Sequence, residues 1–439
     1  MTTGALAALA AVLIVQLQYT LPYAVAIAFF AAYPIVTSIV WVTTSMFFVL
    51  RWERGSGRGP GIGDDAGAQA DDDRAALPPV TVLIPAHNEA EVIVDTLLAA
   101  CRIDYPRFEI VVVDDGSTDA TARRVKPFLP TGRVRLVRKR VNEGKAMALN
   151  DALPLCRGEI VLTLDADAAP DAQILRRIVP HFRAARVGAV TGNPRVRNAV
   201  SFLARLQAIE FSSIVSLLRR SQRVWGRVVT VSGVVAAFRR SAVLDVGGFS
   251  PDMPTEDIEL TWKLQKRFYD VRYEPRAIVW MTVPVSIAGL YRQRLRWARG
   301  LMQVFHRHAD VILHWKYRRM WPVYVESALS ILWAVCFVVL TGIWLASWAI
   351  GVPPVGASPI PNLWGMTIAT LCMLQLFTGA LVDRQYDRGI LRFYAYAVWY
   401  PLVYWMFLSV TTVLSLRWLF KAPARRAVRW NTRRTGPAA

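Results

Sequence analysis

Long apolar segments at both ends of the chain constrain its fold more than any other feature. They fill the first 50 residues and much of 321–420, whereas residues 78–285 alternate short apolar and polar pieces. Apolar runs of about 20 residues are long enough to cross a bilayer as helices, and the alternation between them is typical of a soluble α/β domain. The sequence therefore predicts a soluble domain held at a membrane by helices that precede and follow it.

The net charge of +20 comes from basic residues that gather where the apolar segments meet water. Arg51, Arg54 and Arg58 follow the first apolar block, and further basic runs lie at 292–319 and 421–434. This distribution follows the positive-inside rule for an inner-membrane protein, with anionic lipid as the counter-charge. It argues against nucleic acid as a partner. The four cysteines have neither metal-type nor redox-type spacing, so we expect no disulfide framework.

The N-terminal apolar part divides into two blocks, at 4–19 and 23–50, which predict a transmembrane helical hairpin over residues 1–50. A signal peptide is the alternative, but it would need an early basic region and a cleavage site followed by polar sequence, and both are missing. Residues 51–77, which are rich in Gly, Asp and Ala, predict a flexible linker.

The soluble part, residues 78–285, alternates strands and helices. Such alternation implies right-handed βαβ units and a parallel sheet, in which ligands bind beyond the carboxyl ends of the strands. We expect strands at 80–85, 108–113, 134–137 and 160–164, and helices at 89–101, 118–129 and 143–153.

Two aspartates follow the last of these strands. Asp165 and Asp167 lie two residues apart, so their carboxylates share one side of an extended chain and repel each other. A divalent cation compensates this repulsion, and carboxylate oxygens suit Mg²⁺ or Mn²⁺. A solvated turn is the alternative, because turns favour Asp on their own account.

Polar residues also stand near the ends of the other strands. Asp115 would either cap the following helix or accept the N3–H of a uracil ring. His87 would either flank the same base or lie at the surface as an ordinary histidine. Lys145 begins a helix, where a cation opposes the macrodipole, and this indicates an anionic partner such as a diphosphate.

Two later segments supply further candidates. Acidic residues open a helix at 257–268; acids are ordinary in a first turn, but Asp257 is also our candidate general base. An Arg-rich helix with interleaved aromatics follows at 291–297, a pattern typical of a membrane surface. Within it, Arg296 is able to clamp a leaving diphosphate, and Trp297 offers a flat face on which a sugar ring can stack.

These motifs together resemble the family 2 glycosyltransferases, inverting enzymes with an α/β GT-A, Rossmann-like fold. The matching pieces are Val113-Asp114-Asp115-Gly116-Ser117, Asp165-Ala166-Asp167, Thr255-Glu256-Asp257 and Gln293-Arg294-Leu295-Arg296-Trp297. The last, Gln-x-x-Arg-Trp, marks the processive membrane members that make polysaccharides. Residues 78–420 more closely resemble the bacterial poly-β-1,6-N-acetylglucosamine synthases, through the passages at 187–195, 231–240 and 273–277.

The resemblance implies a role for each matched residue. Asp115 would contact uracil, Asp167 the metal, and Asp257 would be the base. His87 departs from the aromatic residue common at the base-stacking position. We therefore expect donor binding by Pro85, His87, Glu89, Asp115, Lys145, Asp165, Gln293 and Arg296, acceptor binding by Ser232, Gly233, Glu256 and Trp297, catalysis by Asp257 and metal binding by Asp167.

The resemblance also implies the reaction and its setting. The chain would use UDP-N-acetylglucosamine to extend a growing β-1,6-linked polysaccharide at the bacterial inner membrane, with a cytoplasmic catalytic domain and a small accessory membrane subunit. The alternatives are a hyaluronan- or chitin-type synthase, a transferase that adds one sugar to a lipid carrier, and a non-catalytic nucleotide-binding sensor.

The C-terminal region poses a topological problem. Interface helices are expected at 286–320, and a transmembrane region at 321–420 contains spans at 323–350, 361–382 and 391–420, the last broken at Pro401. Three crossings from a cytoplasmic domain would leave the basic tail, 421–439, outside, against the positive-inside rule. Either 391–420 makes two re-entrant half-spans, or another segment lies along the interface.

Overall fold

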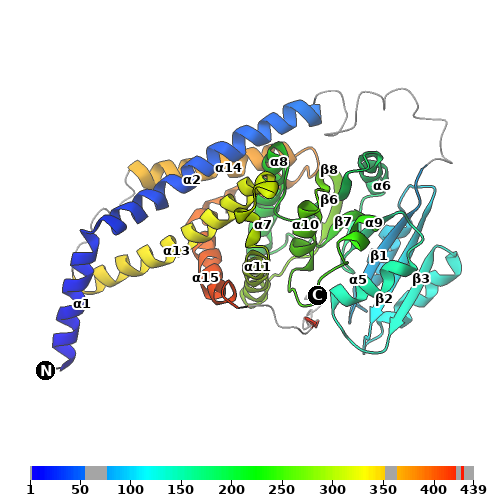
Figure 1. Ribbon diagram of the computed structural model, residues 1–439, viewed down its shortest axis with the longest axis horizontal. Coiled ribbons are helices and arrows are strands. Elements are labelled where there is room, and N and C mark those ends of the chain that lie inside the picture. Colours follow the sequence, from blue (N-terminus) through cyan, green and yellow to red (C-terminus); the bar gives the residue numbers. More distant parts are fainter. Residues whose placement is uncertain (1, 55–76, 352–362, 422–426, 430–439) are drawn as a thin grey trace.

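A mixed sheet with covering helices forms one end of the molecule, and long apolar helices extend away from it (Figure 1). The computed structural model describes residues 2–54, 77–351, 363–421 and 427–429. The sheet has eight strands in the order β3-β2-β1-β4-β7-β6-β8-β5. They are β1 (Val80–Ala86), β2 (Phe108–Asp115), β3 (Val134–Lys139), β4 (Ile160–Leu164), β5 (Ala169–Pro170), β6 (Val187–Val196), β7 (Val235–Arg239) and β8 (Asp270–Met281).

Strands β3, β2, β1 and β4 form the parallel half of the sheet that the sequence predicts. Every residue of β1 and β4 is buried, because apolar side chains pack against neighbouring elements on both faces of these central strands. Their carboxyl ends lie at one edge, so the segments that follow Ala86, Asp115 and Leu164 are neighbours. The prediction of parallel βαβ units is confirmed for this half.

The other half of the sheet contains antiparallel pairs. β7 runs antiparallel to both β4 and β6, whereas β6 and β8 are parallel. The prediction that β4 is a parallel strand is therefore confirmed for its pairing with β1 and wrong for its pairing with β7. The chain enters β7 beside the carboxyl end of β4, where the Asp165 N–H donates to the Val234 carbonyl oxygen at 3.2 Å and continues the antiparallel ladder. This brings the loop before β7 to the edge where the acidic strand ends lie.

The helices between the strands are shorter than predicted. α3 (Ile93–Cys101) begins four residues later than expected. Asn88 has a positive φ of 56°, and the Glu89 N–H donates to Thr121 Oγ1 at 2.8 Å, so the backbone before α3 is held in a turn. α4 (Thr121–Val125) gives way to a 3₁₀ helix ahead of Pro127, which lacks the N–H needed to continue it. α5 (Lys145–Ala152) begins two residues later than the expected 143, at the lysine that was also predicted to open a helix.

Further helices complete the domain and lead to the membrane part. Ser286 caps α11 by accepting from the Gly289 N–H at 3.2 Å. The helices are α6 (Ile174–Ile178), α7 (Phe202–Glu210), α8 (Leu217–Trp225), α9 (Arg240–Asp245), α10 (Glu256–Lys266), α11 (Ile287–Arg307) and α12 (Asp310–Leu313).

Within the described residues, three helical stretches are long and apolar enough to cross a membrane: Leu21–Arg54, Trp315–Ala349 and Gly365–Asp383. They contain α2 (Leu21–Phe48), α13 (Trp321–Ala349) and most of α14 (Leu363–Asp383), and α1 (Thr2–Gln18) precedes them. The helical turn Val49–Arg54 extends α2 into the start of the predicted linker, which is wrong for residues 51–54. Residues 55–76 of that linker lie outside the described part.

Polar pairs join the apolar helices to one another. Ser38 Oγ donates to Gln375 Oε1 at 2.7 Å between α2 and α14, and Gln18 Nε2 donates to Ser347 Oγ at 2.8 Å between α1 and α13. All four residues are buried. Because lipid supplies no hydrogen-bond partner, such pairs help to select which helices pack together.

The last apolar segment folds back toward the catalytic domain. It consists of the 3₁₀ helix η8 (Ile390–Val398), a π-helical turn at Tyr400–Tyr404 that contains the proline, α15 (Trp405–Ser415) and a final 3₁₀ turn at Leu416–Trp418. Near its start Tyr394 OH donates to the Met373 carbonyl oxygen of α14, and near its end the Leu419 carbonyl oxygen bonds His306 of α11. These contacts pack the two ends of the segment against α14 and α11, and its re-entrant path stays a prediction.

Candidate active site

Lys145, the first residue of α5, lies at the centre of a cluster of acidic groups. Its Nζ donates to Asp165 Oδ1 at 2.7 Å and to the Gly233 carbonyl oxygen at 2.9 Å, and it lies 3.3 Å from Glu256 Oε1. Burial alone would lower the pKa of Lys145, but the carboxylates of Asp165 and Glu256 raise it above its ordinary value. The predicted anionic partner of this lysine is therefore supplied, in this conformation, by the protein's own carboxylates.

Asp257 stands beside this cluster, at the start of α10. A Cβ added to Gly233 would lie 2.8 Å from Asp257 Oδ2, so the absence of a side chain there lets the carboxylate approach the backbone. Burial and the neighbouring Glu256 raise the pKa of Asp257 to about 6, although Lys145 and Arg296 act to lower it. A carboxylate with such a pKa suits proton transfer near neutral pH.

The two aspartates after β4 differ in their surroundings. Asp165 is partly exposed and holds Lys145, whereas Asp167 is 5% exposed. Among the residues that the structure describes, no three His, Cys, Asp or Glu side chains form a ready-made metal cage. This donor set nevertheless fits Mg²⁺ or Mn²⁺, because such ions are commonly held by one or two carboxylates together with substrate phosphates.

Asp115, at the end of β2, is fully buried and shapes the loop before α5. Its Oδ2 accepts from the Gly144 N–H at 2.7 Å, and its Oδ1 accepts from the Glu143 N–H at 3.2 Å and lies 3.3 Å from Lys139 Nζ. It does not cap the helix that follows β2. A carboxylate offers about four acceptor positions, so Asp115 is able to accept a further hydrogen bond. Its contact with uracil stays a prediction.

His87 lies directly beside Asp115, as the parallel strand order requires. Its Nδ1 is 2.8 Å from the Asp115 carbonyl oxygen, which only accepts, so Nδ1 carries the proton. Its Nε2 then accepts from the side-chain amides of Asn142, at 3.1 Å, and Asn88, at 3.2 Å. The ring is fixed on both sides and only partly buried, which leaves it in position to line a ligand.

Two other predicted donor residues lie at the end of β1 and just beyond it. Pro85 is buried in β1 opposite Val113 of β2, and Glu89 is 6% exposed in the turn before α3. Both therefore belong to the strand edge that carries His87 and Asp115.

The Gln-x-x-Arg-Trp residues of α11 have separate environments. Gln293 Oε1 is buried and has no hydrogen-bond partner among the described residues. Because buried polar atoms are usually hydrogen-bonded, this oxygen is suited to accept a hydrogen bond from a bound ligand. Arg296 is exposed, and its Nη1 donates to the Pro254 carbonyl oxygen at 3.2 Å, which holds it beside the residues before α10. Trp297 is half-buried, and the guanidinium of Arg294 stacks on its ring, 4.4 Å from the centroid.

Residues that the sequence did not single out brace the predicted ones. Arg294 donates to Glu210 at the end of α7, and Tyr404 OH donates to the same carboxylate at 2.9 Å. Among the predicted acceptor residues, the Ser232 N–H donates to Thr191 Oγ1 at 2.8 Å. Arg294 could have been found from the sequence, because its i,i+3 spacing from Trp297 in a helix places both residues on one face. No sequence pattern indicates the roles of Glu210, Thr191 and Tyr404.

A short piece of the basic tail also reaches this region. The Val428 N–H donates to the Pro251 carbonyl oxygen at 2.8 Å. Gly144, at φ +94°, lies so close to it that an added Cβ would stand 2.1 Å from the Val428 carbonyl oxygen. The tail therefore contacts the loop that holds Asp115.

The chain combines acidic strand ends, a carboxylate of raised pKa and a cationic helix with a mixed α/β sheet and apolar helices, as expected for a membrane glycosyltransferase of the GT-A type. Residues 78–300 match the model of the glycosyltransferase-like family 2, and the chain belongs to this family of enzymes. The predictions of fold class and of a glycosyltransferase are confirmed.

Curated relatives match nearly the whole chain. It is 32% identical over 394 residues to a poly-β-1,6-N-acetyl-D-glucosamine synthase of Staphylococcus epidermidis, across 88% of this chain and 93% of the relative. The corresponding protein of Staphylococcus aureus strain COL is 33% identical over 384 residues, across 86% and 90%. A solved mannosyltransferase from Pyrobaculum calidifontis shares the fold, with a TM-score of 0.59 and 24% identity across 89% of this chain and 99% of its own.

Proposed function

We propose that this chain is an inverting, processive synthase that transfers N-acetylglucosamine from UDP-N-acetylglucosamine to a growing β-1,6-linked polysaccharide. One observation carries the proposal: Asp257, whose pKa is raised to about 6, lies against Gly233 beside Lys145 and Asp165. Such a carboxylate is ionised at neutral pH and still basic enough to take a proton during the reaction. The names of the staphylococcal relatives support the choice of sugar and linkage.

In the proposed reaction the Asp257 carboxylate accepts the proton of the acceptor hydroxyl while that oxygen attacks the anomeric carbon of the donor. The bond between the anomeric carbon and the β-phosphate oxygen breaks in the same displacement, and its electron pair leaves with UDP. Attack on the face opposite the leaving group inverts the anomeric carbon and gives a β linkage. Lys145 and Arg296 favour the charge that develops on the departing diphosphate.

The remaining roles follow the geometry of the site. His87, Pro85, Glu89 and Asp115 would surround the uracil end of the donor. Ser232, Gly233, Glu256 and Trp297 would line the acceptor, and the unpartnered Gln293 Oε1 would accept a hydrogen bond from the bound sugars. Asp167 would hold Mg²⁺ or Mn²⁺ with Asp165 beside it. When bound, the metal supplies positive charge to the leaving diphosphate.

We further propose that the enzyme is a multi-pass protein of the bacterial inner membrane with a cytoplasmic catalytic domain. The basic residues Arg51 and Arg54 lie at the end of the α2 stretch, and Lys316, Arg318 and Arg319 lie at the start of the α13 stretch. Both positions are on the catalytic-domain side of the spans, as the positive-inside rule requires. A small membrane subunit, which the family resemblance implies, would bind these helices.

The test uses the purified full chain in lipid nanodiscs, offered several UDP-sugars singly with Mg²⁺ or Mn²⁺. We expect long polymer only from UDP-N-acetylglucosamine, and we expect a hydrolase specific for β-1,6 linkages to degrade it. A single added sugar would instead support the lipid-carrier transferase, and a polymer resistant to that hydrolase would support a chitin- or hyaluronan-type synthase. Absence of any turnover by a well-folded sample would contradict the proposal.

A further inference from the structure

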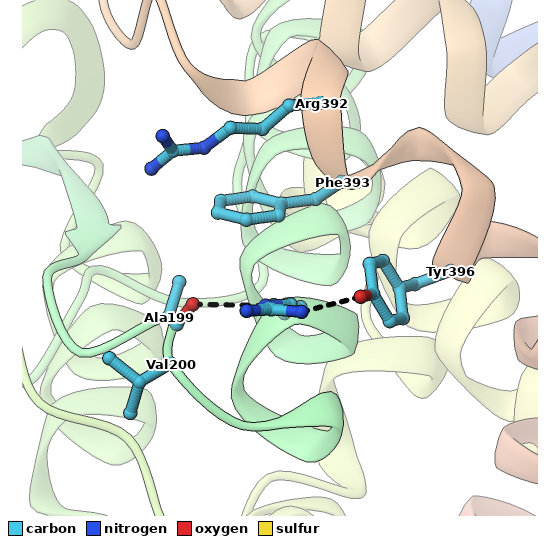
Figure 2. A pocket seen from close by; sticks show the side chains of 6 residues that line it. Ala199, Val200, Arg392, Phe393 and Tyr396 are labelled. Atoms are coloured by element: carbon cyan, nitrogen blue, oxygen red, sulfur yellow. Dashed lines mark hydrogen bonds between the residues drawn. The ribbon is translucent and has the colours of Figure 1, made fainter.

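A hollow between α7 and η8 lies outside the site described above. Its volume is about 400 Å³, and it is lined by Ala199, Val200, Arg205, Arg392, Phe393 and Tyr396. None of these residues has a predicted role in donor, acceptor or metal binding. Figure 2 shows the lining from close by, with the Phe393 ring between Arg392 and the guanidinium that makes two hydrogen bonds.

Two arginines in this hollow are held by neutral groups alone. Arg205 donates from Nε to the Ala199 carbonyl oxygen at 3.3 Å and from Nη1 to Tyr396 OH at 2.5 Å, and it stacks 5.4 Å from the Tyr396 ring centroid. Arg392 stacks 4.6 Å from the Phe393 centroid. Neither guanidinium is within ion-pair distance of a carboxylate in the part of the chain that the structure describes.

This arrangement suits an anion with several oxygens. A guanidinium carries five N–H donors in a planar fork, so Arg205 keeps donors beyond its two protein contacts, and the exposed Arg392 has donors to spare. Aromatic stacking fixes both groups, which reduces the entropy lost when they bind a ligand. Phosphate oxygens match this fork in geometry and charge.

Apolar side chains beside the hollow indicate a lipid surface. Val200 is 76% exposed, Phe202 48% and Trp399 46%. The Phe202 ring lies 5.6 Å from the Tyr396 ring and 6.1 Å from the Trp399 ring, which makes one aromatic patch. Exposed aromatics of this kind are typical of the boundary between membrane and water, and η8 is fixed along the spanning helix α14 through Tyr394 and Met373.

We propose that this hollow binds the phosphate headgroup of an anionic phospholipid of the surrounding bilayer. Arg205 and Arg392 contact the phosphate oxygens, and the acyl chains lie along Val200, Phe202 and Trp399. The two cations have no carboxylate partner among the described residues and suit a negative ligand, while the exposed apolar rim suits an apolar one. A phospholipid supplies both in one molecule, whereas free phosphate satisfies only the arginines.

The site also has a connection to the acceptor region. Arg205 lies near the start of α7, and Glu210 ends the same helix, where it binds Arg294 beside Trp297. A lipid held at Arg205 would therefore stabilise the helix that braces the acceptor tryptophan.

The proposal is tested by native mass spectrometry of the full chain in detergent, titrated with phosphatidylglycerol or phosphatidylcholine of identical acyl chains. We expect tighter binding of phosphatidylglycerol, and a loss of about fivefold in its affinity in Arg392→Gln, from about 1 kcal/mol per basic residue at a lipid surface. Arg384→Gln is the matched control: it removes the same charge from an exposed position outside the hollow, and we expect wild-type affinity.

Three results would overturn the proposal. The first is equal binding of the two lipids, and the second is an equal loss in both variants, which would indicate non-specific attraction. The third is displacement of the lipid by inorganic phosphate at an equal concentration, which would assign the hollow to the free ion. Arg392 is exposed, and its side chain makes no hydrogen bond within the part of the chain that the structure describes, so its replacement costs the fold little beyond the stacking on Phe393. Arg205→Lys, which retains the charge but loses the fork, provides a second variant with an intermediate loss.

Discussion

Replacement of Asp257 by Asn tests two effects of this carboxylate separately: it lowers the free energy of unfolding, and it raises the rate of the reaction. The pKa of Asp257 rises from an ordinary 3.8 to about 6 because the group is buried beside Glu256. A shift of about two units corresponds to about 3 kcal/mol at most, at about 1.4 kcal/mol per unit. Asn removes the buried charge, and its Oδ1 can still accept from the Ile258 N–H, as Asp257 Oδ1 does at 2.9 Å.

The sign of the effect follows from proton binding. The folded state holds an extra proton between about pH 4 and pH 6, so the stability of the wild type falls as pH rises through this window and stays lower above it. We expect Asp257→Asn to lack this slope and, at pH 7.5, to unfold up to about 10 °C higher than the wild type. Polymer synthesis should fall by about 10²-fold or more, while UDP binding persists.

The assay measures thermal unfolding and polymer synthesis of both proteins from pH 4.5 to pH 8. The wild-type kcat/KM should rise with pH through about 6, because the base must be ionised. Glu256→Gln is the comparison variant: it keeps the base but removes the neighbouring carboxylate that raises the pKa of Asp257, so the rise of kcat/KM should move to lower pH. Near-normal turnover by Asp257→Asn, or a lower unfolding temperature at pH 7.5, would refute the reasoning.

Other substitutions test the surrounding contacts. Lys145→Met should cost about 1.5–3 kcal/mol, because it leaves Asp165 and Glu256 without their cation, and it should abolish donor binding, because the proposed contact with the diphosphate is lost. Lys266→Met, which breaks a more exposed pair, should cost about 1 kcal/mol or less in the same thermal scan. Trp297→Ala should weaken acceptor binding more than UDP binding in calorimetric titrations, and equal losses would contradict its acceptor role. Arg294→Met should destabilise by about 3–5 kcal/mol, and adding Glu210→Leu should recover most of this loss, since the buried charge is then gone; no recovery would show that the pair is not the cause.

Strand order accounts for what the sequence could predict of the site. His87, Asp115 and Asp165 each lie at the carboxyl end of a strand in the parallel half of the sheet, so their proximity follows from βαβ topology alone. The contact of Lys145 with Glu256 did not follow from it, because Glu256 lies on a helix far along the chain, after the antiparallel strand β7. Periodicity cannot show which way β7 runs, and that direction is what carries Gly233 to Lys145.

In the membrane part, the sequence predicts helix bounds that depend on length and hydropathy. It does not predict the path of a segment that depends on tertiary contacts. α13 and α14 lie close to their expected bounds. The course of 391–420 depends instead on Tyr394, His306 and Leu419, whose single hydrogen bonds leave no periodic pattern in the sequence.

The contact between Val428 and Gly144 has a consequence for how the protein matures during synthesis. Chains emerge from the ribosome N-terminus first, and domains begin to fold as they appear. The loop that holds Asp115 is complete in sequence once α5 has emerged, but its contact with Val428 has to wait until the membrane segments up to Leu419 have been made. The predicted nucleotide end of the site therefore reaches its final form only after the membrane helices that follow it have been synthesised.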